Sequence, residues 1–220
     1  MKIIAEIGWN HMGDMDLAKK MIDATKEAGA DYAKFQTWST KNLKSGPWDT
    51  DGRLEIYKKA ELKKDQHFML KEYCDSIGIQ FLTSVFNHND VSWLSELGIE
   101  TIKVASMEIH NENILEAVNS NFNNILLSTG ASNWSELLNA KKIIDESKLT
   151  LLHCVSSYPT KAENVNLPRI DKIRGIHPKV GYSGHFKGID DAIAALSYNC
   201  LLYTSPSPRD QRGSRMPSSA

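Results

Sequence analysis

The sequence predicts an α/β protein, a (β/α)8 TIM-type barrel that stops after about seven βα units. Short apolar runs rich in β-branched and aromatic residues alternate with stretches of helical spacing, which is typical of a parallel sheet. The runs are apolar throughout, as strands covered on both faces are. Seven such units exceed what an open flavodoxin-like sheet needs, whereas a complete barrel typically takes about 250 residues.

Seven segments are expected to form strands. Each is a short apolar run that a turn or helix signal follows. The predicted strands are 3–6, 32–36, 80–85, 101–106, 124–129, 149–155 and 179–183.

Helical spacing of apolar residues separates most of these strands. The clearest predicted helices cover residues 17–24, 68–74 and 137–144. Gly29 and Gly78 follow the first two, as glycines commonly do at helix C-termini. Asp14 and Asn133 are the expected N-caps, because their side chains accept hydrogen bonds from the first free N–H groups of a helix.

The last part of the chain differs from the rest. Residues 200–220 are rich in Pro, Ser and Arg and show neither a helical nor a strand period. We therefore predict an incomplete barrel over residues 1–199 and a disordered tail over 200–220, which resembles a translated vector or adapter sequence. Such an open barrel would expose the edges of its first and last strands, and we expect poor stability and impaired activity.

Composition excludes several classes of function. The formal net charge of −1 gives no electrostatic ground for binding nucleic acid or an anionic membrane. No apolar run is long enough to span a bilayer, and the first ten residues lack the apolar core of a signal peptide. Cys74, Cys154 and Cys200 show neither disulfide nor zinc spacing, which favours a cytoplasmic location.

Polar residues gather at the C-terminal ends of the predicted strands. In a barrel these ends form one rim, and active sites lie there. The residues are Glu6, Lys34, Gln36, Ser84, Lys103, Ser106, Glu108, Ser128, Ser156, Tyr158, Ser183 and His185. Polar groups from every strand at one rim would be unusual in a purely structural chain.

Lys34 and Lys103 lie within apolar strands, where an ammonium group is costly unless it meets an anion or loses its proton. A salt bridge to Glu6 or Glu108 would explain either lysine without a function. Two lysines together with several serine hydroxyls favour a site for a phosphate or carboxylate. A Schiff base on one lysine, as in aldolases, is a further possibility.

Glu6 and Glu108 are candidate acid/base groups, with structural counter-ions as the alternative. The glycines around His185 leave space for a ligand at a strand end. His185 is therefore a candidate metal ligand or proton carrier, but one histidine does not make a metal site.

Six stretches of the sequence, taken in order, resemble the sialic acid synthase family. They are AEIGWNHMGDMDLAKKMIDATKEAGADYAKFQTW (5–38), FLTSVFN (81–87), IKVASMEI (102–109), ILLSTG (125–130), LLHCVSSYPT (151–160) and VGYSGHF (180–186). Each motif is weak alone, but the ordered set is specific and covers about residues 1–199. The family includes N-acetylneuraminate synthase and the legionaminic and pseudaminic acid synthases.

The resemblance implies an activity. Phosphoenolpyruvate would condense with the aldehyde of an N-acylated amino sugar, N-acetylmannosamine or a bacterial 2,4-diacetamido sugar, to give a nonulosonic acid and phosphate. A divalent ion, Mn²⁺ or Mg²⁺, would polarise the aldehyde, and no Schiff base is used. The full-length parent would be a homodimer. Another phosphoenolpyruvate–aldose synthase and an inactive phosphate-binding fragment are the alternatives.

The resemblance also implies residue roles. Lys34 and Lys103 match lysines that bind phosphoenolpyruvate, and Glu6 and Glu108 match carboxylates near the reacting atoms. Further donors to phosphoenolpyruvate would be Ser84, Ser106, Ser128, Ser156 and Ser183, and the sugar-contacting positions would be Gln36 and Tyr158.

The metal site that the resemblance implies is only partly present. His185 matches the first metal-binding histidine, and Gly184 stands where some members have Asp. The family's second metal histidine, in a motif like ERHF on the eighth strand, has no counterpart in this sequence, and neither has the family's C-terminal antifreeze-like domain.

Overall fold

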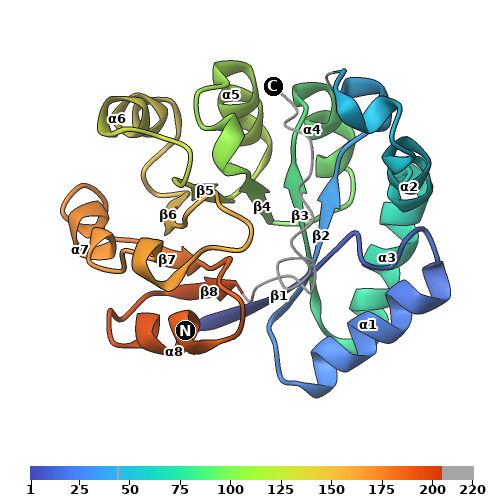
Figure 1. The fold of residues 1–220 in the computed structure, drawn as a ribbon, viewed down its shortest axis with the longest axis horizontal. Helices are drawn as coiled ribbons and strands as arrows, with labels where there is room; N and C mark the ends of the chain where they lie inside the picture. The colour runs from blue at the N-terminus through green and yellow to red at the C-terminus, as the bar shows by residue number, and fades with distance from the viewer. Residues whose placement is uncertain (44, 205–220) are drawn as a thin grey trace.

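The computed structural model describes residues 1–43 and 45–204 and forms a closed barrel of eight parallel strands, paired in chain order (Figure 1). The strands are β1 (Lys2–Gly8), β2 (Tyr32–Thr37), β3 (Gln80–Val85), β4 (Thr101–Val104), β5 (Asn124–Ser128), β6 (Leu149–His153), β7 (Val180–Ser183) and β8 (Leu202–Thr204). The predicted (β/α)8 fold class is confirmed.

Helices surround the barrel in the described part of the chain (Figure 1). The α-helices are α1 (Met15–Glu27), α2 (Arg53–Ala60), α3 (Lys64–Ile77), α4 (His88–Ser95), α5 (Glu112–Asn121), α6 (Trp134–Ile143), α7 (Arg169–Arg174) and α8 (Asp190–Leu196). Short 3₁₀ turns are η1 (Thr40–Asn42), η2 (Pro47–Asp49), η3 (Ser106–Glu108) and η4 (Ala162–Asn164).

The two residues predicted as N-caps do cap their helices. The Asp14 side chain accepts the Leu17 N–H at the start of α1, and the Asn133 side chain accepts the Glu136 N–H at the start of α6. Gly78 ends α3 with φ of 72°, a left-handed conformation that costs glycine little.

The prediction of an open barrel of seven strands is wrong. β8 falls inside the segment predicted as a disordered tail, and it closes the barrel by pairing with β1 and β7. The run Leu201–Thr204 is itself apolar and prone to form a strand, but the Pro- and Ser-rich sequence after it hid this signal. Pairing also removes the exposed edges of β1 and β7. The remainder of that segment, 205–220, lies outside the described residues, and its non-native origin stays a prediction.

The barrel interior changes from apolar to polar along each strand. Residues two positions apart point to the same face of a strand. At the N-terminal end, the inward layer consists of Ile4, Leu82, Leu126, Leu152 and Leu202, which form one buried cluster. Two residues further along the chain in each case, the corresponding positions are Glu6, Ser84, Ser128, Cys154 and Thr204. The strands therefore carry an apolar layer below a polar one.

The outward faces of the strands and the helices form the larger core cluster. Phe35 and Phe81 stack at 5.4 Å between ring centroids on neighbouring strands. This burial on both faces explains why the strands read as apolar runs in the sequence. In the described part of the chain, no helix is long and apolar enough to cross a membrane.

Candidate functional site

The polar residues predicted at the strand ends lie side by side in the barrel interior. The strand register places Glu6 opposite Lys34, Gln36 opposite Ser84, and Ser84 opposite Lys103. Opposite residues on parallel neighbours point to the same face of the sheet. The first four strands therefore bring these five side chains to one region.

Lys34 and Glu6 form a buried ion pair at this end of the barrel. Lys34 Nζ lies 2.6 Å from Glu6 Oε2, with 1% of the lysine side chain and 9% of the glutamate side chain exposed. Burial lowers the pKa of Lys34 to about 8, and Lys103 lowers it as well, whereas the Glu6 carboxylate raises it. The salt bridge considered for Lys34 from the sequence is thus present, and its ammonium group is poised to lose its proton near pH 8.

Lys103 reaches across the barrel from β4 to β7. Its Nζ donates a hydrogen bond to Ser183 Oγ at 3.0 Å, and both residues are buried. The strand register and the burial of both lysines place the two cations in one interior. Two buried ammonium groups, with one carboxylate paired to Lys34, favour an anion in the space they face.

Three strand ends converge on Ser106, which begins η3 after β4. The Gly130 N–H, just after β5, donates to Ser106 Oγ at 3.1 Å. Cys154 Sγ, just after β6, lies 3.0 Å from the same oxygen. Ser156 Oγ approaches Gly130 so closely that a Cβ on the glycine would lie 2.8 Å from it. Ser128, at the end of β5, is buried.

Tyr158 and His185 lie against each other on the loops after β6 and β7, with their rings tilted by 50°. Their ring centroids are 4.1 Å apart, and the Thr160 N–H donates to the His185 carbonyl oxygen at 2.8 Å. Glu108 is buried at the end of η3, where Asn111 Nδ2 donates to its Oε2 at 2.9 Å. The structure thus brings Tyr158 and His185 together after the ends of β6 and β7.

The described residues do not by themselves provide a complete metal centre. No group of three or more His, Cys, Asp or Glu side chains among them is arranged to hold a metal ion. His185 would therefore be one protein ligand among water and substrate atoms, which falls short of a closed site.

Two residues that sequence reasoning did not assign to the site are Gly130 and Cys154. Both follow strand ends directly, in the motifs ILLSTG and LLHCVSSYPT. Their position after the strands was visible in the sequence, but their contacts with Ser106 join residues 24 and 48 positions apart.

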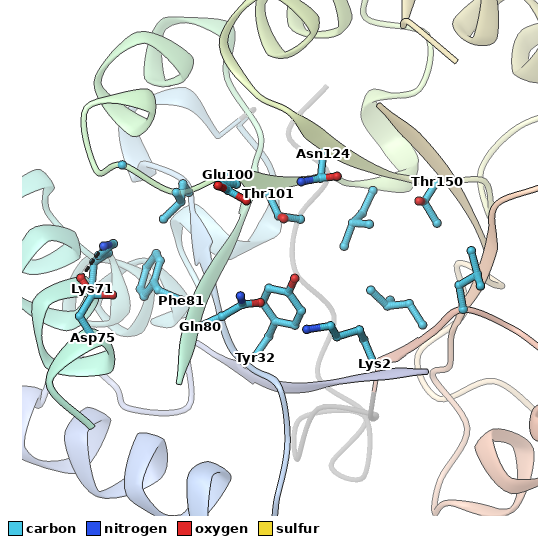
Figure 2. A pocket seen from close by; sticks show the side chains of 15 residues that line it. Lys2, Tyr32, Lys71, Asp75, Gln80, Phe81, Glu100, Thr101, Asn124 and Thr150 are labelled. Carbon is cyan, nitrogen blue, oxygen red and sulfur yellow. Dashed lines mark hydrogen bonds and ion pairs between the residues drawn. The ribbon is translucent and has the colours of Figure 1, made fainter. Parts of the chain in front are cut away.

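A cavity at the opposite end of the barrel contains none of the predicted site residues. Its volume is about 580 Å³, and it is lined by N-terminal strand residues that include Lys2, Tyr32, Gln80, Asn124 and Thr150 (Figure 2). Figure 2 shows these side chains around the mouth of the barrel. Because barrel enzymes use the C-terminal end for chemistry, the candidate site stays with the buried lysines.

Comparisons with known proteins agree with this architecture. The chain is 34% identical over 217 residues to the N,N'-diacetyllegionaminic acid synthase of Campylobacter jejuni, covering 91% of this chain and 65% of that protein. It is 33% identical over 209 residues to the N-acetylneuraminate-9-phosphate synthase of Homo sapiens, covering 89% and 58%. The chain spans 56 to 65% of the length of the curated relatives it matches.

A solved structure is similar over nearly the whole chain. The crystal structure of N-acetylneuraminic acid (sialic acid) synthetase from Leptospira borgpetersenii matches with a TM-score of 0.87 and 32% identity, covering 98% of this chain and 78% of that one. A family model described as the NeuB family matches residues 21–200. Since that match covers most of the chain, including the strands β2 to β7, the chain belongs to the NeuB family.

Proposed function

We propose that this chain is the synthase barrel of a nonulosonic acid synthase. Phosphoenolpyruvate and water react with the aldehyde of an N-acylated amino sugar, N-acetylmannosamine or a 2,4-diacetamido sugar, and the products are a nonulosonic acid and inorganic phosphate. The observation that carries the proposal is the pair of buried lysines, Lys34 and Lys103, in one polar barrel interior. Membership of the NeuB family supports the same reaction class.

In the proposed site, the two lysines bind the anionic groups of phosphoenolpyruvate. Their charges offset the phosphate and carboxylate, and the hydroxyls of Ser106 and Ser183 supply directed hydrogen bonds. An anion bound there also relieves the repulsion between the two buried ammonium groups.

The remaining proposed roles are proton transfer and sugar binding. Glu6, held by Lys34 at 2.6 Å, is placed to exchange a proton with the attacking water or the new hydroxyl. Gln36 and Tyr158 face the sugar, and Glu108 is the second candidate acid/base group. A divalent ion at His185 stays a prediction, as does a homodimeric parent.

The proposal is tested by measuring phosphoenolpyruvate binding to the 220-residue chain by calorimetry. We expect binding by the unmodified chain and at least about tenfold weaker binding by Lys103→Gln, because a charge-assisted hydrogen bond contributes about 1.5–3 kcal/mol. Lys148→Gln, on the Asn119 carbonyl outside the interior, is the matched control. An unmodified chain that does not bind phosphoenolpyruvate would contradict the proposal.

Phosphate release with a panel of N-acyl amino sugars then identifies the aldehyde. We expect slow turnover from this chain, since no group of three or more His, Cys, Asp or Glu side chains among the described residues is arranged to hold the divalent ion. Binding of phosphoenolpyruvate without any phosphate release would favour the alternative of a phosphate-binding fragment. Release with phosphorylated simple aldoses only would favour another phosphoenolpyruvate–aldose synthase.

A further inference from the structure

The hydroxyl of Ser106 is held by two neighbours from other strands. The Gly130 N–H donates to Ser106 Oγ at 3.1 Å, and Cys154 Sγ lies 3.0 Å from the same atom. Cys154 is 2% exposed and is a free thiol. The side chain therefore has one hydrogen bond from the backbone and one contact with sulfur.

The two contacts differ in strength. The backbone N–H is a strong donor that occupies a lone pair of Ser106 Oγ and fixes where the oxygen lies. A thiol is only a weak donor and a weak acceptor. The Ser106 hydroxyl therefore does not donate a hydrogen bond to a strong acceptor. An anion that enters the site can accept this hydrogen bond without breaking a strong one.

Gly130 can make this contact because it has no side chain. A Cβ at position 130 would lie 2.8 Å from Cys154 Sγ, 2.8 Å from Ser156 Oγ and 3.0 Å from the Cys154 carbonyl oxygen. The glycine does not have a left-handed backbone conformation, so the requirement is one of space. An added methyl group would push the Cys154 sulfur and the Ser156 hydroxyl, which both follow β6, away from position 130.

We propose that Gly130 and Cys154 are positioning residues that hold the Ser106 hydroxyl ready to donate to the anionic substrate. The inference rests on the proposed function, because it takes that substrate to be phosphoenolpyruvate. The Gly130 N–H fixes the position of Ser106 Oγ, and Cys154 Sγ is a weak hydrogen-bond partner of the hydroxyl that the anion replaces. Neither residue needs to touch the substrate.

The test is a double-mutant cycle on phosphoenolpyruvate binding by the full chain, measured by calorimetry. We expect Ser106→Ala to weaken binding about tenfold or more, because it removes a hydrogen bond to a charged group. Cys154→Ala and Cys154→Ser should each weaken it about three- to tenfold. Alanine releases the Ser106 rotamer, whereas serine replaces sulfur with an oxygen that competes for the hydroxyl proton.

The cycle separates positioning from a general effect on packing. In the Ser106→Ala background, Cys154→Ala should cause no further loss, because the group it positions is gone. Gly130→Ala should weaken binding, and Cys154→Ala should restore part of that loss by removing one of the colliding atoms. Thermal midpoints show whether each variant folds. If Gly130→Ala or Cys154→Ala does not fold, the comparison of Cys154→Ser with the unmodified chain tests the positioning role.

Two matched controls are available in the chain. Cys74→Ala removes another buried free thiol, in α3, and Gly175→Ala adds a methyl group at a glycine with φ of −64°. Both should leave the dissociation constant unchanged.

The outcomes distinguish this inference from the proposed function. If the unmodified chain binds phosphoenolpyruvate but Cys154 variants bind as tightly, the positioning role is wrong and the function stands. Additive losses in the cycle would also overturn it, since they show that Cys154 does not act through Ser106. An unmodified chain that binds no phosphoenolpyruvate would contradict the proposed function, and this inference with it.

Discussion

The buried Lys34–Glu6 ion pair influences the protonation state of the lysine. Burial disfavours the ammonium form, and the carboxylate 2.6 Å away favours it. The balance leaves the pKa of Lys34 at about 8. The charge that binds an anion is therefore sensitive to pH in a range where an exposed lysine is fully protonated.

Phosphoenolpyruvate binding should weaken as the pH rises through about 8, because Lys34 then loses its proton. Glu6→Gln removes the group that raises the Lys34 pKa, so the inflection should move to lower pH. Calorimetric titrations between about pH 6.5 and 9.5 measure both curves. Equal inflections in the two proteins would show that Lys34 is not the titrating group.

Two buried histidines make the stability of the fold sensitive to acid. Burial lowers the pKa of His11 and of His67 from 6.5 to about 4. Both rings are neutral in the folded state, whereas the unfolded chain protonates them near pH 6.5. The unfolded state then binds more protons, so the free energy of unfolding falls as the pH drops from about 6.5 to 4.

His67→Gln should reduce that slope by about one proton, which corresponds to about 1.4 kcal/mol per pH unit. Urea unfolding at several pH values measures the slope. His88→Gln is a suitable control because His88 lies at the exposed start of α4. An unchanged slope in His67→Gln would contradict the assignment.

At the scale of elements, α3 is fastened to two strands that carry site residues. His67 Nδ1 donates to the Lys63 carbonyl oxygen at 2.9 Å, and its Nε2 accepts from the Thr37 hydroxyl at 2.8 Å. Thr83 Oγ1 lies 2.8 Å from Thr37 Oγ1 and completes the chain. Thr37 and Thr83 adjoin Gln36 and Ser84, so the outward faces of β2 and β3 are fixed directly behind the site.

The eighth strand is short, and Tyr203 ties it to α8. Tyr203 Oη donates to the Ala195 carbonyl oxygen at 2.8 Å, and Tyr203 lies opposite Ile3 on β1 and Tyr182 on β7. This contact, together with the strand pairing, is what closes the barrel in place of the predicted open edge.

Tyr203→Pro should therefore destabilise the protein by about 3 kcal/mol or more, because proline removes a ladder N–H from a strand paired on both sides. Tyr203→Phe should cost only about 1 kcal/mol, the value of one hydrogen bond. Chemical unfolding of both variants gives the comparison. Equal stability of the two variants would show that β8 does not close the barrel in solution.

At the scale of the whole molecule, stability and chemistry occupy different layers of one interior. The lower layer is the apolar cluster that contains Leu82 and Leu126, and the upper layer holds the lysines. The cavity of about 580 Å³ (Figure 2) is lined by Leu126 and Leu202 of the apolar layer and by residues at the N-terminal ends of the strands, and by none of the candidate site residues. Binding and stability should be separable by mutation.

Leu82→Ala should lower the free energy of unfolding by about 2–5 kcal/mol, as large-to-small changes in a packed core do. Under conditions where the variant remains folded, its dissociation constant for phosphoenolpyruvate should match that of the unmodified chain. Ser84→Ala, two residues further along β3, should weaken phosphoenolpyruvate binding and leave the free energy of unfolding nearly unchanged. A parallel loss of binding in both variants would contradict the separation of layers.

Much of the fold, and many of the polar residues that lie at the strand ends, could be predicted from the sequence. Apolar runs, caps such as Asp14 and Asn133, and polar residues at strand ends are local signals, and each reflects the chemistry of a few neighbouring residues. Lys34 and Lys103 stood out because an ammonium group inside an apolar strand is costly. The end of the barrel was misjudged because three strand residues, Leu202–Thr204, precede a Pro- and Ser-rich sequence.

The sequence by itself determined a parallel β/α barrel, seven of its eight strands and the polar residues at the ends of those strands. Only the tertiary structure decided that β8 closes the sheet, that Lys34 pairs with Glu6 and Lys103 with Ser183, and that Gly130 and Cys154 hold Ser106. The physical reason is range. Strand and helix signals arise within a few residues, whereas pairing, burial and the resulting pKa shifts depend on side chains that only folding brings together.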